Sequence, residues 1–195
     1  MKANLKKRII CYIVDLIIIS SICFIISMII PKSDTFINIQ NQISNLSNDY
    51  LNNEVTFGSY FNLFSELSNK LDRANILYMS ISFGISILYF VIIPLFLKGR
   101  TIGMMICKLK IRLKDNKKLI SSVLIRSIIS YGILFYLLQL LIMYFILDKN
   151  YLIILTFLAI IQILVVICNA FMIKYRDDKR SLADILSSSN ILIES

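Results

Sequence analysis

Histidine and tryptophan are absent from this 195-residue sequence, and glycine, proline and cysteine are scarce. Without histidine, the chain lacks the commonest general base and the commonest metal ligand. The four cysteines form no C-x-x-C pair, so their simplest role is that of small hydrophobic side chains in helices. We therefore expect no metal, no cofactor and no enzymatic activity.

Charged residues are also few, at 17% of the chain against roughly 25% in soluble domains. Hydrophobic residues make up 57%, and the apolar stretches are long enough to cross a bilayer. They predict four membrane-spanning helices, at residues 9–30, 76–97, 121–146 and 151–173. The first stretch is too long for a typical signal-peptide core, contains Asp15 and lacks a small-x-small cleavage site, which favours an uncleaved helix.

Basic residues are distributed unevenly between the predicted spans. The N-terminal arm, the loop 98–120 and the tail 174–195 together carry sixteen Lys or Arg, against four in the loop 32–73 and the turn near residue 149. The positive-inside rule therefore places both termini in the cytoplasm. The net charge of +9 suggests anionic lipid headgroups as a partner rather than nucleic acid, since the basic loop has no aromatic residue for base stacking. The bias towards Ile, Asn, Lys and Ser is typical of an AT-rich bacterial genome, so we expect a bacterial cell membrane.

The loop 32–73 is polar but has helical periodicity. Hydrophobic residues recur at helical spacing in two stretches, and Gly58-Ser59 offers a break and an N-cap between them. We predict two amphipathic helices that lie against the outer membrane face or against each other. A partly disordered loop is the alternative.

Residues 108–114 alternate between basic and apolar side chains, which is typical of a strand. Residues 181–186 fit a short interfacial helix, and the segment that begins at Asn190 looks extended. We predict that this last segment pairs with the strand to form a small cytoplasmic two-stranded sheet. We expect the basic side chains of the strand to contact lipid headgroups: Lys108, Lys110, Arg112 and Lys114.

Two ionisable residues fall inside the predicted spans, where a charge is costly and often functional. Asp15 lies in the first span and Arg126 at a similar depth in the third, so we predict that they pair. Arg8 lies seven residues before Asp15 and its side chain points away from it, so its predicted partner is Asp184 in the tail, with lipid headgroups as the alternative. An Asp15–Arg126 pair would either fix helix packing or form an ion or proton site.

These residues resemble the motifs of the RDD family of bacterial membrane proteins. The correspondence covers an Arg and an Asp in the first helix, a T-x-G element in the basic loop, an Arg in a later helix and a closing L-x-D element: Arg8, Asp15, Thr101, Gly103, Arg126, Leu182 and Asp184. The sequence departs from the family pattern at three positions: Ala183 stands for a usual His, Lys108 for a common Gly and Met104 for a common Lys.

The sequence therefore predicts an all-α membrane protein with a single domain over residues 1–195. It would be a four-helix transmembrane bundle with outer amphipathic helices and a small β element. The resemblance implies a largely undefined role, and we favour interaction with, or regulation of, other membrane components, including a homo-oligomer or a membrane-protein partner. The alternatives are a cation/proton antiporter or small-solute transporter that uses Asp15, and immunity against a membrane-active toxin.

Overall fold

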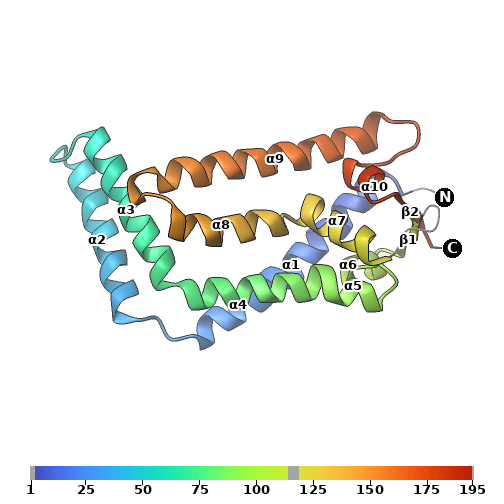
Figure 1. Cartoon of the computed structure of the whole chain (residues 1–195), viewed down its shortest axis with the longest axis horizontal. Coiled ribbons are helices and arrows are strands. Elements are labelled where there is room, and N and C mark those ends of the chain that lie inside the picture. The colour runs from blue at the N-terminus through green and yellow to red at the C-terminus, as the bar shows by residue number, and fades with distance from the viewer. Residues whose placement is uncertain (1–2, 114–118, 195) are drawn as a thin grey trace.

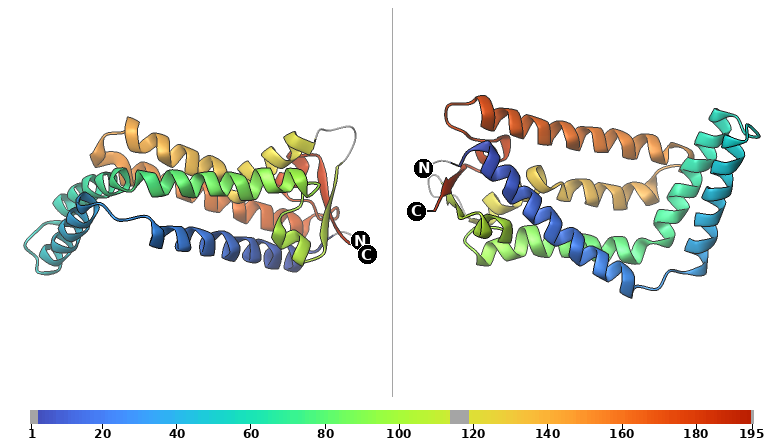
Figure 2. Two further views of the ribbon diagram at one scale, coloured as in Figure 1. Left: turned by 90° about the horizontal axis from the view of Figure 1, so that it is seen from below. Right: turned by 180° about the vertical axis from the view of Figure 1, so that it is seen from behind.

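The computed structural model describes residues 3–113 and 119–194 (Figure 1). Most of the chain is helical, and long helices run side by side between two ends of the molecule. The end that holds α10, β1, β2 and both ends of the chain is called here the termini end. The opposite end holds the α2–α3 hairpin and is called the hairpin end (Figures 1 and 2).

Among the described residues, three helical segments are long and apolar enough to cross a membrane. The first is α1 (Leu5–Ile29), which begins with an N-cap by Asn4, whose side chain accepts a hydrogen bond from the Lys7 N–H. The second is Ile76–Phe96 and the third is Asp148–Tyr175, which contains the short helix η2 (Asp148–Asn150) and α9 (Tyr151–Tyr175). These segments match the first, second and fourth predicted spans.

The second segment is interrupted by a wide turn. It consists of α4 (Ile76–Ile87), the π-helix η1 (Leu88–Ile92) and α5 (Ile93–Phe96). Pro94 has no N–H to donate and its ring would crowd the carbonyl of the preceding turn. The Ile93 N–H donates instead to the Leu88 carbonyl five residues earlier, so the helix widens just before the proline. Tyr89 lies in this wide turn.

The third predicted span, residues 121–146, is not one helix. It consists of α7 (Leu119–Tyr131) and α8 (Ile133–Phe145), which meet at a bend of 68°. Gly132 between them has φ +67°, and a Cβ there would lie 3.1 Å from the side-chain nitrogen of Gln162. The apolar run continues through the bend, so hydropathy alone did not reveal it. Counted as one broken span, the pair supplies the fourth crossing.

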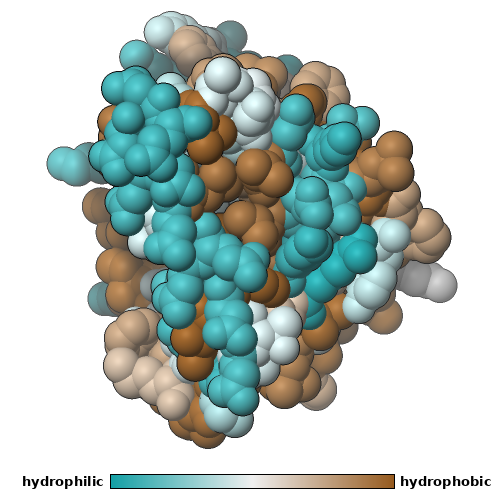
Figure 3. All heavy atoms as spheres, turned by 90° about the vertical axis from the view of Figure 1, so that its left-hand side faces the viewer, coloured by the Kyte–Doolittle hydropathy of each residue, from teal (hydrophilic) through white to brown (hydrophobic). Residues whose placement is uncertain are grey.

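The loop 32–73 forms the two amphipathic helices expected, α2 (Asp34–Leu51) and α3 (Phe57–Ala74). They pack on each other through a stack of Tyr50 on Tyr60, with ring centroids 4.6 Å apart. The predicted break at Gly58-Ser59 is displaced: the helix break lies earlier, and Thr56 is the N-cap of α3. Figure 3 views the hairpin end, where hydrophilic side chains cover much of the face and hydrophobic ones lie between them.

The hairpin is joined to the bundle through α3. The Ser65 hydroxyl donates to the Asp148 carbonyl at 2.8 Å, and the Asn69 side chain donates to the Asp148 carboxylate at 2.6 Å. The Arg73 Nε donates to the Met143 carbonyl at 2.9 Å, and the Tyr151 hydroxyl donates to Asp72. The hairpin therefore caps the end of the bundle formed by α8 and α9.

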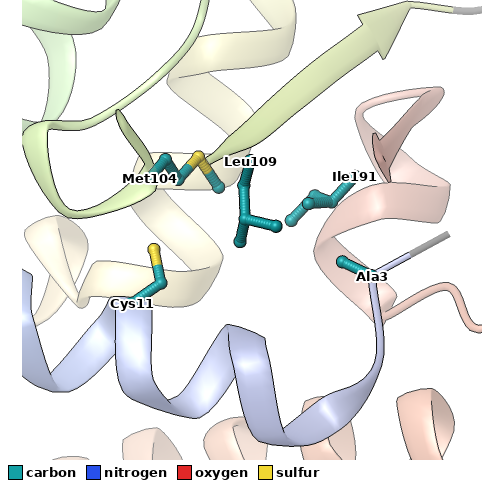
Figure 4. Close-up of a cluster of buried hydrophobic side chains, with 5 residues drawn as sticks. All are labelled: Ala3, Cys11, Met104, Leu109 and Ile191. Atoms are coloured by element: carbon teal, nitrogen blue, oxygen red, sulfur yellow. The ribbon is translucent and has the colours of Figure 1, made fainter. Parts of the chain in front are cut away.

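The predicted two-stranded sheet is present at the termini end. Strand β1 (Leu109–Leu113) pairs antiparallel with β2 (Ser189–Ile193), with Leu109 opposite Ile193. The short helices α6 (Ile102–Ile106) and α10 (Leu182–Leu186) precede the two strands. Leu109 points into a buried cluster with Ala3, Cys11, Met104 and Ile191, which packs the sheet against α1 (Figure 4).

Candidate functional site

Asp15 is fully buried on α1 and accepts hydrogen bonds from neutral donors. Its Oδ1 accepts from the Tyr89 hydroxyl at 2.6 Å and from the Gly103 N–H at 2.8 Å. Its Oδ2 accepts from the Thr101 hydroxyl at 2.7 Å. These three donors take the place of water as hydrogen-bond partners of the buried carboxylate.

The donors come from two elements that lie far from Asp15 in the sequence. Thr101 is the N-cap of α6, where its oxygen accepts from the Met104 N–H while its hydroxyl proton goes to Asp15. Tyr89 comes from the π-helix of the second span. Asp15 therefore joins α1 to both the second span and the loop that follows it.

Glycine is required at position 103 because α6 lies directly on α1. A Cβ there would lie 2.6 Å from the Asp15 Oδ1 and 2.6 Å from the Cys11 carbonyl oxygen. Both distances are shorter than any normal contact, and the second involves backbone that cannot move aside cheaply. These contacts explain the T-x-G element: the threonine hydroxyl donates a hydrogen bond to Asp15, and the glycine allows the backbone of α6 to approach Asp15 closely.

Asp184 is the second fully buried carboxylate, at the start of α10. It forms ion pairs with Arg8 and with Arg126, whose Nη1 lies 2.6 Å from its Oδ1. It also completes a capping box with Ser181, whose N–H donates to its Oδ2 at 3.2 Å. Burial acts to raise the pKa of Asp184, but the charges of Arg126 and Arg8 outweigh burial and hold that pKa below its usual value.

The two arginines bind further groups from the tail and the sheet. Arg8 donates from Nε to the Ala3 carbonyl at 3.2 Å and from Nη2 to the Lys179 carbonyl at 2.8 Å. Arg126 donates from Nη1 to the Ser189 hydroxyl at 3.0 Å. We call Arg8, Arg126 and Asp184 the arginine latch, because they tie α1, α7 and α10 together at the termini end.

The predicted pair of Arg8 with Asp184 is confirmed. The predicted pair of Asp15 with Arg126 is wrong, because Arg126 binds Asp184 and Asp15 binds hydroxyls and a backbone N–H. The prediction matched charges by depth and did not count neutral donors. Tyr89 was missed altogether, and the only sequence signal for it is a tyrosine in a span shortly before Pro94.

The basic strand presents its charges to the surface. Lys108, Lys110 and Arg112 are exposed, whereas Leu109 is buried, as the alternation predicts. Lys114 lies outside the described residues. Contact of these side chains with lipid headgroups stays a prediction.

A family comparison covers nearly the whole chain. A model described as "RDD family" matches residues 2–188. The chain belongs to the RDD family. No significant match was found among curated proteins or among solved structures. The resemblance read from the motifs is confirmed, and with the apolar helices it identifies this RDD protein as a multi-pass membrane protein.

The site offers little for metal chemistry. Across residues 3–113 and 119–194, no group of three or more Cys, Asp or Glu is arranged to hold a metal ion. What the arrangement does is connect elements: one carboxylate holds the second span and the basic loop on α1, and the other holds the tail on α1 and α7.

Proposed function

We propose that this RDD protein is non-enzymatic and acts by contact with, or regulation of, other membrane components, with both termini in the cytoplasm. One observation carries the proposal: both carboxylates buried near α1 are engaged by donors of the same chain. Asp15 accepts from Tyr89, Thr101 and Gly103, and Asp184 is held by the arginine latch. Such groups hold a scaffold together, and other membrane components would contact its lipid-facing helices.

Transport is the second candidate, and a cavity favours it. A cavity of about 850 Å³ lies among α1, α4 and α8, and Ile19 and Ser86 line it. Ile19 lies one helical turn from Asp15, and Ser86 lies three residues before Tyr89. Asp15 itself does not line this cavity, and Ile19 and Tyr89 belong to a buried hydrophobic cluster with Phe90. The absence of Asp15 from the cavity lining makes transport the weaker candidate.

The test is cation-driven proton flux in liposomes, with wild type compared with Asp15→Asn. We expect no flux from either protein, provided that circular dichroism and size-exclusion chromatography show folded protein. We also expect Asp15→Asn to be less stable, because its amide presents a donor to groups that are themselves donors. Wild-type flux that disappears in a folded Asp15→Asn protein would establish transport and contradict the proposal.

A second experiment tests for contact with other membrane proteins. A photo-crosslinking residue at Phe157 on α9, which is 63% exposed, is compared with one at Phe24 on α1, which is 59% exposed. A contact surface should give a discrete adduct in native membranes at one position and not at the other. Absence of adducts at both positions, and at their helical neighbours, would count against the proposal.

A further inference from the structure

A second, smaller cavity lies beside the arginine latch. It has a volume of about 140 Å³ and is bounded by α1, α7 and α9 and by the β element. Cys11, Met104, Leu109 and Ile191 form its apolar floor (Figure 4). Arg8 and Arg126 also line it, although their side chains are only 8% exposed.

Positive charge exceeds negative charge at this cavity. The guanidiniums of Arg8 and Arg126 share the single carboxylate of Asp184. Arg180 also turns towards α10, where it donates to the Asp184 carbonyl at 3.0 Å. None of the described residues that line the cavity is acidic, and Asp15 lies outside its lining. A buried charge without a full partner is costly, so the cavity favours an anion.

Arg126 has donors that remain available. Its Nη1 bonds both Asp184 and Ser189, which accounts for the protons on that nitrogen. Among the described residues, no acceptor is hydrogen-bonded to its Nε or Nη2. These two nitrogens form one edge of the guanidinium, and this fork geometry suits two oxygens of a phosphate group.

The cavity reaches the lipid-facing surface between α1 and α9. Ile9 on α1 and Val166 on α9 both line it and are 45% and 37% exposed. Leu5, Ala170 and Ile173 continue the same apolar lining. A ligand that enters here meets hydrocarbon-like walls first and the arginines at the inner end. This order matches an amphiphile with an anionic head.

We propose that this cavity binds the phosphate group of an anionic membrane lipid, with its acyl chains lying between α1 and α9. A cavity of about 140 Å³ is much smaller than a whole lipid, so it accepts the phosphate group and leaves the acyl chains outside. The exposed basic side chains of β1 do not line the site, and the proposal does not depend on whether the protein transports or binds partners.

The test is native mass spectrometry of protein extracted from vesicles of equal phosphatidylglycerol and phosphatidylcholine. We expect one retained lipid per chain, with phosphatidylglycerol preferred by about tenfold, because the choline cation of phosphatidylcholine would be repelled by the arginines that attract its phosphate. Arg126→Gln should remove the preference. Because that change also weakens the latch, the deciding variant is Ala170→Leu, which fills the cavity without altering a charge.

The matched control is Ala159→Leu, the same change on α9 at a residue that does not line the cavity. It should retain lipid like wild type. Equal retention of the two lipids by wild type, or full retention by Ala170→Leu, would overturn the proposal. Inorganic phosphate should compete for the site; thermal stabilisation by phosphate without any lipid retention would overturn the lipid as its source.

Discussion

At the scale of single residues, the need for glycine at particular backbone positions explains more of the site than charge does. Gly84 and Gly103 both lie in helices, but only Gly103 faces another helix at contact distance. Lys108 has φ +52°, a left-handed conformation that favours glycine, and it stands where the RDD family commonly has Gly. The motif residue Gly103 and the departure at Lys108 thus both lie where the backbone favours glycine.

Gly103→Ala should lower the free energy of unfolding by about 2–3 kcal/mol, the range of severe overpacking. The added methyl group would push α6 away from the Asp15 carboxylate and the Cys11 carbonyl. Thermal unfolding in detergent micelles measures the loss. Gly84→Ala is the control, because its Cβ would meet nothing within 4 Å and should be neutral or stabilising by up to ~1 kcal/mol.

Lys108→Gly should have the opposite sign and raise stability by about 0.5–1 kcal/mol, because glycine adopts φ > 0 without a steric cost. The Lys108 carbonyl would still accept from the Glu194 N–H. Lys110→Gly, inside β1, is the comparison and should destabilise. If both changes destabilise the protein equally, the positive φ of Lys108 carries no steric cost that glycine can relieve.

At the scale of elements, bends in the spans come from single residues. The wide turn η1, which comes just before Pro94, holds Tyr89 on Asp15, and Gly132 divides the third span. Both features are local, and both change which side chains face the interior. The helical segments between them follow ordinary hydrophobic patterning.

Gly132→Ala should destabilise the protein by about 1–2 kcal/mol, because φ +67° is unfavourable for alanine and its methyl group would press on Gln162. The double variant Gly132→Ala/Gln162→Ala should recover the steric part and keep the conformational part. The measurement is thermal unfolding of the two variants beside Gln162→Ala alone. Complete recovery would show that the backbone conformation costs nothing.

Some of these features could be predicted from the sequence and others could not. Span positions follow from apolar length, the β1–β2 pairing from strict alternation, and the Arg8–Asp184 pair from the direction of the arginine side chain. The partner of Asp15 could not be found by matching charges, because hydroxyl and backbone donors carry no net charge. The bend at Gly132 was hidden because glycine does not interrupt an apolar run of this length.

At the scale of the whole molecule, the two ends are held differently. The hairpin end relies on hydrogen bonds around Asp148 and Asp72, and the termini end relies on the arginine latch and the sheet. Burial raises the pKa of Asp72, whereas the arginines lower that of Asp184. The two ends should therefore respond to acid in opposite directions.

The lowered pKa of Asp184 means that the folded protein holds this proton less tightly than the unfolded chain. The stability that the charged Asp184 contributes to the fold is complete above the ordinary pKa of 3.8. It is lost as the pH falls through the lower pKa that Asp184 has in the folded protein. The protection factors of the β2 amides against hydrogen exchange, which are corrected for the intrinsic pH dependence of exchange, should therefore fall below about pH 3.8. In Asp184→Asn, the β2 amides should be less protected than in wild type at neutral pH, and their protection should no longer fall below pH 3.8.

Asp178→Asn is the control for that experiment. Its carboxylate pairs with Arg176 at the surface, and this pair lowers its pKa to about 2. Because the side chains are solvated, the pair contributes little to stability. The same acid response in wild type and in Asp184→Asn would rule out the latch as its origin.

The sheet also imposes an order on biosynthesis. β1 leaves the ribosome before α7, α8 and α9, but its partner β2 follows all of them. Throughout the synthesis of those helices, β1 and its apolar residue Leu109 have no partner strand. Arg8 and Arg126 likewise have no carboxylate partner until Asp184 has been synthesised. The bundle can therefore enter the bilayer helix by helix, but its termini end closes only after the last strand emerges. A nascent chain stalled before residue 184 would insert normally and still expose this unfinished end to proteolysis.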